Sequence, residues 1–105
     1  MQDEVEFRRA AQSTIDDLKQ HLIAREEEHQ AGFEVEEQGH VLNVAFEHNA
    51  GKLVIMANGP TRQIWIATPD ASFKLEWDPA SGKFALARTG EPLMLLVDRL
   101  IDERL

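Results

Sequence analysis

Acidic side chains are the residues in this sequence whose type and spacing could bind a metal ion. They form an adjacent pair, a run of three at the end of a helical pattern, and an alternating pair in a strand pattern: Asp16 and Asp17; Glu26, Glu27 and Glu28; Glu34 and Glu36. Hard cations such as Fe²⁺ and Ca²⁺ prefer oxygen ligands. His29 could add a nitrogen ligand. We expect weak, water-rich binding, because no spacing among these residues resembles a dedicated metal cage.

The same carboxylates have a simpler interpretation. Acids on a helix surface and at a strand edge keep a small protein soluble and its edges unpaired. However, Glu26 to Glu28 follow the helical pattern, where the helix dipole disfavours each negative charge by about 0.3–1 kcal/mol. A helix that needed only solubility could carry lysine there. The run of three glutamates therefore favours binding of a cation or of a basic partner.

The sequence contains no arrangement of residues that is typical of a catalytic site. The chain lacks cysteine, which removes disulfides, thiolate metal sites and cysteine nucleophiles together. Its four histidines are scattered without an H-x-x-x-H pair, and its serines lack the surroundings of a nucleophile. Asp16 and Asp17 are adjacent, so their side chains diverge on a helix. We expect that the protein is not an enzyme.

Length and charge limit the other classes of function. The 105 residues suffice for one domain, residues 1–105, with a single core. With 19 acidic and 11 basic side chains the formal charge is −8, which would repel a nucleic-acid backbone. Neither a signal peptide nor an apolar run of membrane-spanning length is present. We therefore expect a cytoplasmic protein that binds neither nucleic acid nor membrane.

The hydrophobic period predicts a helix, a series of strands and a second helix. Apolar residues recur every three or four positions from Glu4 to about Glu27: Phe7, Ala11, Ile15, Leu18 and Leu22. After Gly32 the period falls to two, and turn residues separate the runs VLNVAFE, KLVIMA, RQIWIAT, SFKLEW and KFALAR. The last helix should follow Thr89 as a cap, with Pro92 in its first turn.

These elements predict an α+β fold of two layers. Both helices should pack on one face of a five- to six-stranded antiparallel sheet, leaving the other face open to water. In the run QIWIATP, Ile64 and Ile66 would then face the helices, and Trp65 would stand on the open face with Gln63. An exposed Trp beside an amide has the composition of an interface anchor. The alternative is that Trp65 lies under a loop or that the faces are reversed.

Several landmarks resemble the frataxin family, including its bacterial CyaY-type members. Besides the order helix, meander, helix, they are GHVL at 39–42, the turn at Pro60, QIWIATP, a strand ending in Trp77, and Arg-Thr-Gly before the last helix. The resemblance runs from Phe7 to about Leu100. It implies a protein that binds iron weakly through surface carboxylates and docks on the cysteine desulfurase and scaffold protein that build iron–sulfur clusters. It also implies that the outward Trp lies in the contact.

The sequence departs from the family pattern at the implied contact. The residues that would form it are Met56, Asn58, Gln63, Trp65 and Lys74. A family turn of the form N-x-Q-x-P is here Met-Ala-Asn-Gly-Pro, so a polar contact has become apolar at Met56. Lys74 stands where the family commonly has Arg, and keeps the charge without the fork geometry.

Two further departures affect the core and the acidic ridge. A second family Trp is replaced by Phe84. Several helix positions that are acidic in the family are not acidic here: Gln12, Ser13, Gln20, Ile23 and Ala24. The departures leave a second hypothesis open, that of an acidic α/β protein-interaction module of the secretion-chaperone kind without a metal role. We expect a monomer, with iron-dependent oligomerisation as the alternative.

Overall fold

The first helix begins and ends close to the predicted positions. The computed structural model describes residues 3–28, 32–47 and 51–105, so His29 lies outside the described residues. Helix α1 spans Glu4–Glu26. The Asp3 carboxylate accepts a hydrogen bond from the backbone N–H of Val5 at 2.9 Å, which satisfies a donor that the helix leaves unpaired.

The strands form a single antiparallel sheet. They are β1 (Phe33–Gln38), β2 (Val41–Phe46), β3 (Lys52–Asn58), β4 (Gln63–Ala67), β5 (Ser72–Asp78) and β6 (Lys83–Leu86). The spatial order β1-β2-β3-β4-β5-β6 is the sequence order, so each strand pairs with the one that follows it. The predicted meander is confirmed, and the described residues contribute six strands to it.

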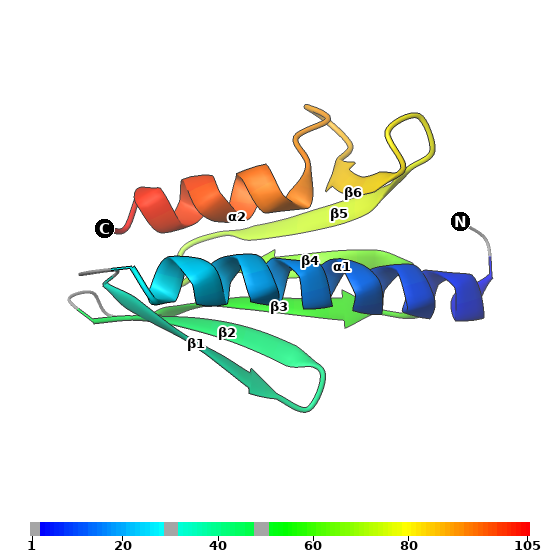
Figure 1. The fold of residues 1–105 in the computed structure, drawn as a ribbon. Helices are drawn as coiled ribbons and strands as arrows, with labels where there is room; N and C mark the ends of the chain where they lie inside the picture. Colours follow the sequence, from blue (N-terminus) through cyan, green and yellow to red (C-terminus); the bar gives the residue numbers. More distant parts are fainter. Residues whose placement is uncertain (1–2, 29–31, 48–50) are drawn as a thin grey trace.

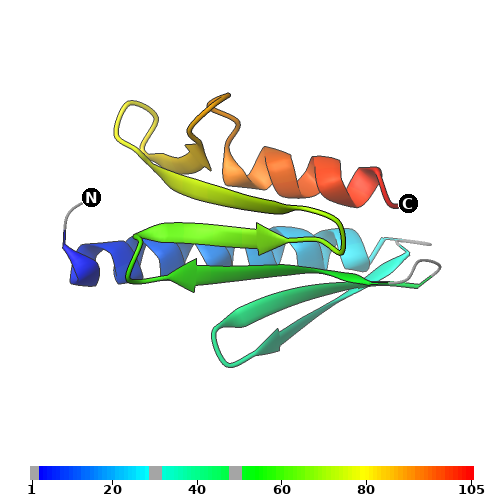
Figure 2. The same cartoon turned by 180° about the vertical axis from the view of Figure 1, so that it is seen from behind.

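Both helices cover one face of this sheet. Helix α2 spans Leu93–Asp102 and runs beside α1 in the same direction (Figure 1). Seen from behind, strands β3 and β4 lie in front of α1, and no helix of the described residues covers this second face (Figure 2). We call it the open face. The two-layer α+β arrangement predicted from the hydrophobic period is therefore confirmed.

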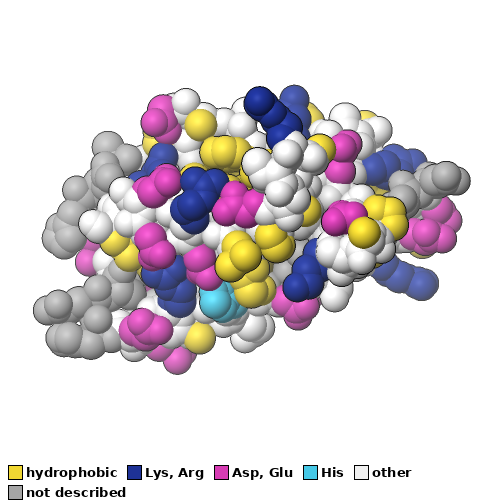
Figure 3. All heavy atoms as spheres, turned by 90° about the horizontal axis from the view of Figure 1, so that it is seen from above, with side chains coloured by type: hydrophobic (Ala, Val, Ile, Leu, Met, Phe, Trp, Pro, Cys, Tyr) yellow, Lys and Arg dark blue, Asp and Glu magenta, His cyan; other side chains and the backbone are white. Residues whose placement is uncertain are grey.

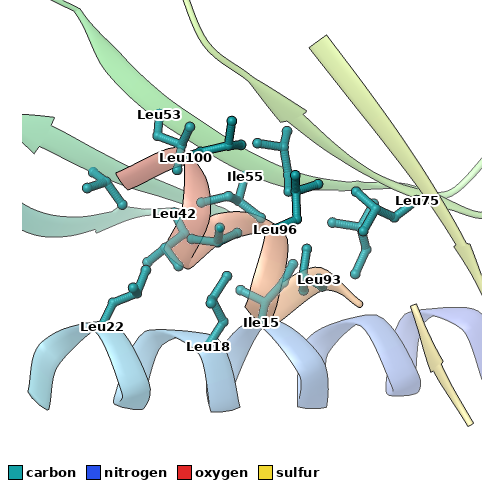
Figure 4. Close-up of a cluster of buried hydrophobic side chains, with 14 of the residues drawn as sticks. Ile15, Leu18, Leu22, Leu42, Leu53, Ile55, Leu75, Leu93, Leu96 and Leu100 are labelled. Atoms are coloured by element: carbon teal, nitrogen blue, oxygen red, sulfur yellow. The ribbon is translucent and has the colours of Figure 1, made fainter. Parts of the chain in front are cut away.

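The core lies between the helices and the sheet. Figure 4 shows Leu18 and Leu22 of α1 and Leu96 of α2 pointing into a cluster that the strands complete with Leu42 and Ile55. All five apolar residues predicted for α1 are buried. Toward the other end, the ring of Phe84 packs edge-on against Phe7 at 5.8 Å and against Trp77 at 5.3 Å between centroids. These contacts fix the helices over the sheet.

The start of α2 differs from the prediction. Thr89 does not cap the helix: α2 begins at Leu93, and Pro92 is the N-cap residue without a side-chain cap bond. The physical reason is that this segment first pairs with the sheet, since Pro92 forms a bridge with Ala85 and the backbone N–H of Leu86 donates to the carbonyl of Glu91 at 3.0 Å. The chain therefore stays extended through Pro92, and Thr89 Oγ1 accepts from the Glu91 N–H instead.

Alternation along β4 sets the direction of the central tryptophan. Ile64 and Ile66 are both fully buried toward the helices. Trp65 is half-buried and projects to the open face, as the strand geometry requires.

No helix in the described part of the chain has the length and apolar composition needed to cross a membrane.

We predict that Ile64→Ala lowers the free energy of unfolding by about 2–5 kcal/mol, because it leaves a cavity beneath the helices. Val5→Ala is the matched control, since Val5 is 60% exposed on α1 and its truncation should change stability by less than about 0.5 kcal/mol. Urea denaturation of both variants measures the difference. Equal losses would contradict the burial assigned to β4.

Candidate functional site

The open face carries a row of three side chains centred on Trp65. The antiparallel register places Met56 of β3 and Lys74 of β5 directly opposite Trp65 of β4. The Lys74 ammonium nitrogen lies 5.1 Å from the centroid of the indole ring, which is a cation–π contact. Side chains directly opposite in neighbouring strands contact one another. We call Met56, Trp65 and Lys74 the central row.

Gln63 holds the polar end of the indole. The Trp65 Nε1–H donates to Gln63 Oε1 at 2.8 Å, and both residues lie on the same side of β4. Because Lys74 contacts the ring and Gln63 accepts from its N–H, the indole is held in one orientation. The row therefore presents an ordered, partly exposed aromatic ring whose N–H group is already bonded within the chain.

Asn58 has a role in the turn that its sequence context did not predict. It pairs with Gln63 in the sheet register. Its Oδ1 accepts from both the backbone N–H and the hydroxyl of Thr61, at 3.2 and 3.0 Å. These bonds order the turn between β3 and β4. The amide thus positions the segment next to the central row.

A small pocket opens beside the central row. Its volume is about 220 Å³. Its lining comes from the three neighbouring strands β3, β4 and β5: Val54, Met56, Trp65, Ile66, Ala67, Ser72, Phe73 and Lys74. Lys74 is the single charged residue among these. The sequence did not predict the pocket, because its formation depends on how side chains of three strands stand next to one another.

The seven predicted metal ligands do not come together. Asp16 and Asp17 are exposed on the middle of α1, and Glu27 and Glu28 are exposed after its end. Glu34 and Glu36 are also exposed, but they alternate with Phe33 and Val35, which face the helices. They therefore point to the open face, away from α1. Within residues 3–28, 32–47 and 51–105, no group of three His, Cys, Asp or Glu residues could hold a metal ion.

Glu26 is engaged in the fold. Its Oε1 accepts a hydrogen bond from the backbone N–H of Val35 in β1 at 3.0 Å. Val35 stands opposite Val44 in the register, and β1 is the edge strand of the sheet. The carboxylate thereby covers part of an edge that could otherwise pair with another chain. Its use as an edge cap is a finding that the run of three glutamates did not indicate.

A charged network joins the two helices. His21 Nε2 lies 2.8 Å from Asp98 Oδ2, and Arg25 bridges Asp98 and Asp102 with two 2.9 Å contacts. Burial lowers the pKa of Arg25, but hydrogen bonds to Asp102 and Asp98 outweigh it and the net shift is upward. The sequence reasoning missed this network because its members are more than 70 residues apart. It adds polar contacts between α1 and α2.

A larger groove lies between the helices near the start of α2. Its volume is about 780 Å³, and apolar side chains such as Trp77, Leu93 and Met94 line it together with His21 and Asp98. Figure 3, which looks onto the side that carries α2, shows hydrophobic side chains beside a histidine near the centre. The groove lies on the helical side, so it is separate from the pocket beside Trp65.

Comparison with known proteins places this geometry in a family. A family model described as a frataxin-like domain matches residues 1–105. The iron-sulfur cluster assembly protein CyaY of Pseudomonas aeruginosa is 32% identical over 85 residues, which are 81% of this chain and 78% of the relative. The protein of the same name from Azotobacter vinelandii is 31% identical over 91 residues, covering 87% and 82%.

A solved structure agrees on the fold. The frataxin from Psychromonas ingrahamii, described as a model for stability modulation within the CyaY protein family, superposes with a TM-score of 0.74. The match covers 97% of this chain and 90% of that chain at 24% identity, so it shows the fold alone. With a family model that spans the full sequence, two relatives above 30% identity and this shared fold, the chain belongs to the frataxin-like family.

Proposed function

We propose that this protein acts in iron–sulfur cluster assembly by docking on the cysteine desulfurase–scaffold complex through the central row of its open face. Membership of the frataxin-like family and two relatives named for iron-sulfur cluster assembly support the process. The choice of this docking surface rests on Trp65, which is half-buried between Met56 and Lys74 on a face that no described helix covers.

The central row suits binding on physical grounds. Tryptophan is enriched among the few residues that dominate interface energies. Binding orders mobile side chains at a cost of about 0.5–1.5 kcal/mol each, and the contacts of Trp65 with Lys74 and Gln63 reduce that cost before a partner arrives. Gln63 and Asn58 extend the surface along the β3–β4 hairpin. A partner that covers this hairpin would bury the indole ring completely.

Iron is proposed as a weakly held cargo. The described acids form no cage for a resident ion, so we propose exchange-labile contacts with water still bound to the metal. The exposed carboxylates of Asp16, Asp17, Glu27 and Glu28 supply the sites along α1. Glu34 and Glu36 supply a separate pair on the open face. Glu26 would first have to leave Val35.

The role is that of a donor of iron or a regulator of the assembly complex, without catalysis by this chain. A cytoplasmic location, the lack of binding to nucleic acid and a monomeric state stay predictions from the sequence. The second candidate is a protein-interaction module of the secretion-chaperone kind. It is favoured by the apolar pocket beside Met56, which enlarges the apolar part of the open face.

We predict that Trp65→Ala weakens binding to the purified desulfurase–scaffold complex by about thirtyfold, the loss expected for a central aromatic contact. Because Trp65 is only half-buried, its removal should lower the free energy of unfolding by no more than about 1–2 kcal/mol. Isothermal titration calorimetry and urea denaturation on the same variant separate the two effects.

Phe84→Ala is the control for that variant, since Phe84 is 1% exposed and faces the helices. It should cost about 3–5 kcal/mol of stability. A stable Trp65→Ala protein that binds the complex as well as the wild type would refute docking through this face. Complete absence of binding by the wild type would leave the secretion-chaperone hypothesis as the better one.

We predict that Co²⁺, used as a paramagnetic stand-in for Fe²⁺, broadens the NMR signals of the exposed acids first. Asp16, Asp17, Glu27 and Glu28 should respond at the lowest metal concentrations, followed by Glu34 and Glu36. Glu26 should broaden together with its neighbour Glu27, although its own carboxylate is bonded to Val35. Glu6, an exposed acid in the first turn of α1, is the internal reference. Broadening of Glu6 equal to that of the predicted residues would show unspecific binding and remove the iron proposal.

We predict that Gln12→Glu and Gln20→Glu each raise Co²⁺ affinity about threefold or more. Both positions are four residues from Asp16, on the same exposed side of α1, and Gln12 Nε2 now donates to Asp16 Oδ1 at 2.9 Å. Either change would add a carboxylate next to Asp16. Ala87→Glu, at an exposed position outside the helices, adds the same charge elsewhere and should leave the affinity unchanged. An equal gain in all three variants would attribute the effect to net charge.

A further inference from the structure

We propose that the pocket beside Trp65 binds one apolar side chain of Leu or Met size from a partner loop, while Lys74 pairs with a carboxylate that is adjacent in that loop. The inference rests on the proposed function, because it specifies the chemistry of the segment that docks on the central row. Met56 is the residue that sets the preference for an apolar side chain.

The size and lining of the pocket indicate a single side chain. Its volume of about 220 Å³ is below the range of about 300–1,000 Å³ typical of small-molecule sites. Val54, Met56 and Ala67 supply apolar walls, and Trp65 supplies an aromatic one. A polar group placed among them would lose water without gaining a hydrogen bond, which costs free energy.

Met56 gives the pocket its apolar character next to the indole ring. It is half-buried and stands directly opposite Trp65. The unbranched thioether side chain can adapt its shape to the group that enters. An asparagine at this position would place an amide against the ring and would favour a polar contact instead. The identity of this one residue therefore decides which kind of side chain is accepted.

Gln63 reinforces the same preference. It already accepts the Nε1–H of Trp65 at 2.8 Å. A partner therefore meets the part of the ring that is still exposed beside Lys74, and gains little from offering a hydrogen-bond acceptor to the indole. Recognition at this point of the surface is apolar.

Lys74 supplies the charge that selects the neighbouring group. In the part of the chain that the structure describes, the ion pairs do not include Lys74. Its ammonium group contacts the Trp65 ring and is the single charge in the pocket lining. A partner that covers the ring would remove water from this ammonium, and an unpaired buried charge is costly. A carboxylate beside the apolar side chain offsets that cost.

This local charge is opposite to that of the whole chain. The protein carries a formal charge of −8, so its net charge attracts basic partners. Around the pocket the complementary group is acidic. A directed contact at the central row therefore has the opposite charge preference to general attraction by the net negative charge.

The experiment uses blocked hexapeptides as probes of the full-length protein. GGLEGG carries the proposed pair, GGLKGG reverses its charge, and GGAEGG removes its apolar side chain. Titration is followed by the NMR signal of the Trp65 indole N–H, assigned with Trp65→Phe. We expect GGLEGG to bind at least threefold more tightly than either of the other two peptides.

Four variants connect the preference to the pocket. Lys74→Glu should reverse the order of GGLEGG and GGLKGG, whereas Lys74→Arg should keep it. Met56→Asn should weaken GGLEGG about tenfold, whereas Met56→Leu, which keeps an apolar wall, should stay within about threefold of the wild type. Met56, Lys74 and Trp65 do not belong to the buried core, so these variants are expected to fold; their amide spectra verify it.

Binding of the three peptides tests the specificity of the pocket, and binding of the desulfurase–scaffold complex tests the proposed function. Equal binding of the three peptides, or no reversal in Lys74→Glu, would overturn the inference even if Trp65→Ala abolished binding of the complex. The expected preferences with no binding of the complex would support the inference and remove the proposed function. Concentration-dependent dimerisation that Trp65→Ala abolishes would show a second copy of the chain as the occupant and would also overturn it.

Discussion

Burial of one face of a six-stranded sheet beneath two helices is the constraint on which the other features of this protein depend. The core side chains of α1 and α2 meet those of the central strands with almost no exposed surface (Figure 4). Side chains alternate along a strand, so every residue next to a core position is turned outward. Ile64 and Ile66 take the buried positions, and Trp65 is left on the open face for that reason.

The open face is made of ordered contacts even though no described helix covers it. Met56, Trp65 and Lys74 come from three strands and meet because the hairpins connecting these strands fix the register. The ammonium of Lys74 and the amide of Gln63 hold the indole from two sides. Such a surface can bind a partner without much rearrangement, which is the condition for an aromatic residue to contribute strongly to affinity.

The acidic residues show how tertiary structure redistributes a pattern that looks uniform in sequence. The sequence predicts the ligand type, but β1 turns Glu34 and Glu36 away from α1. The carboxylate of Glu26 is already engaged, because it accepts a hydrogen bond from the backbone N–H of Val35. What remains on α1 is a set of solvated carboxylates without a shared centre. This arrangement is compatible with a weakly held cargo and differs from a resident metal centre, because the latter needs converging ligands.

The sequence alone determined the order of elements, the core positions of α1 and the outward direction of Trp65, because periods of 3.6 and 2 are local properties of the chain. It did not determine the start of α2, because Pro92 is kept extended by pairing with Ala85 of β6. The contact of Lys74 with Trp65, the edge cap by Glu26 and the bond between His21 and Asp98 were also decided only by the tertiary structure. Each joins residues on different elements, and a residue's own neighbours in sequence carry no information about which distant side chain will pack against it.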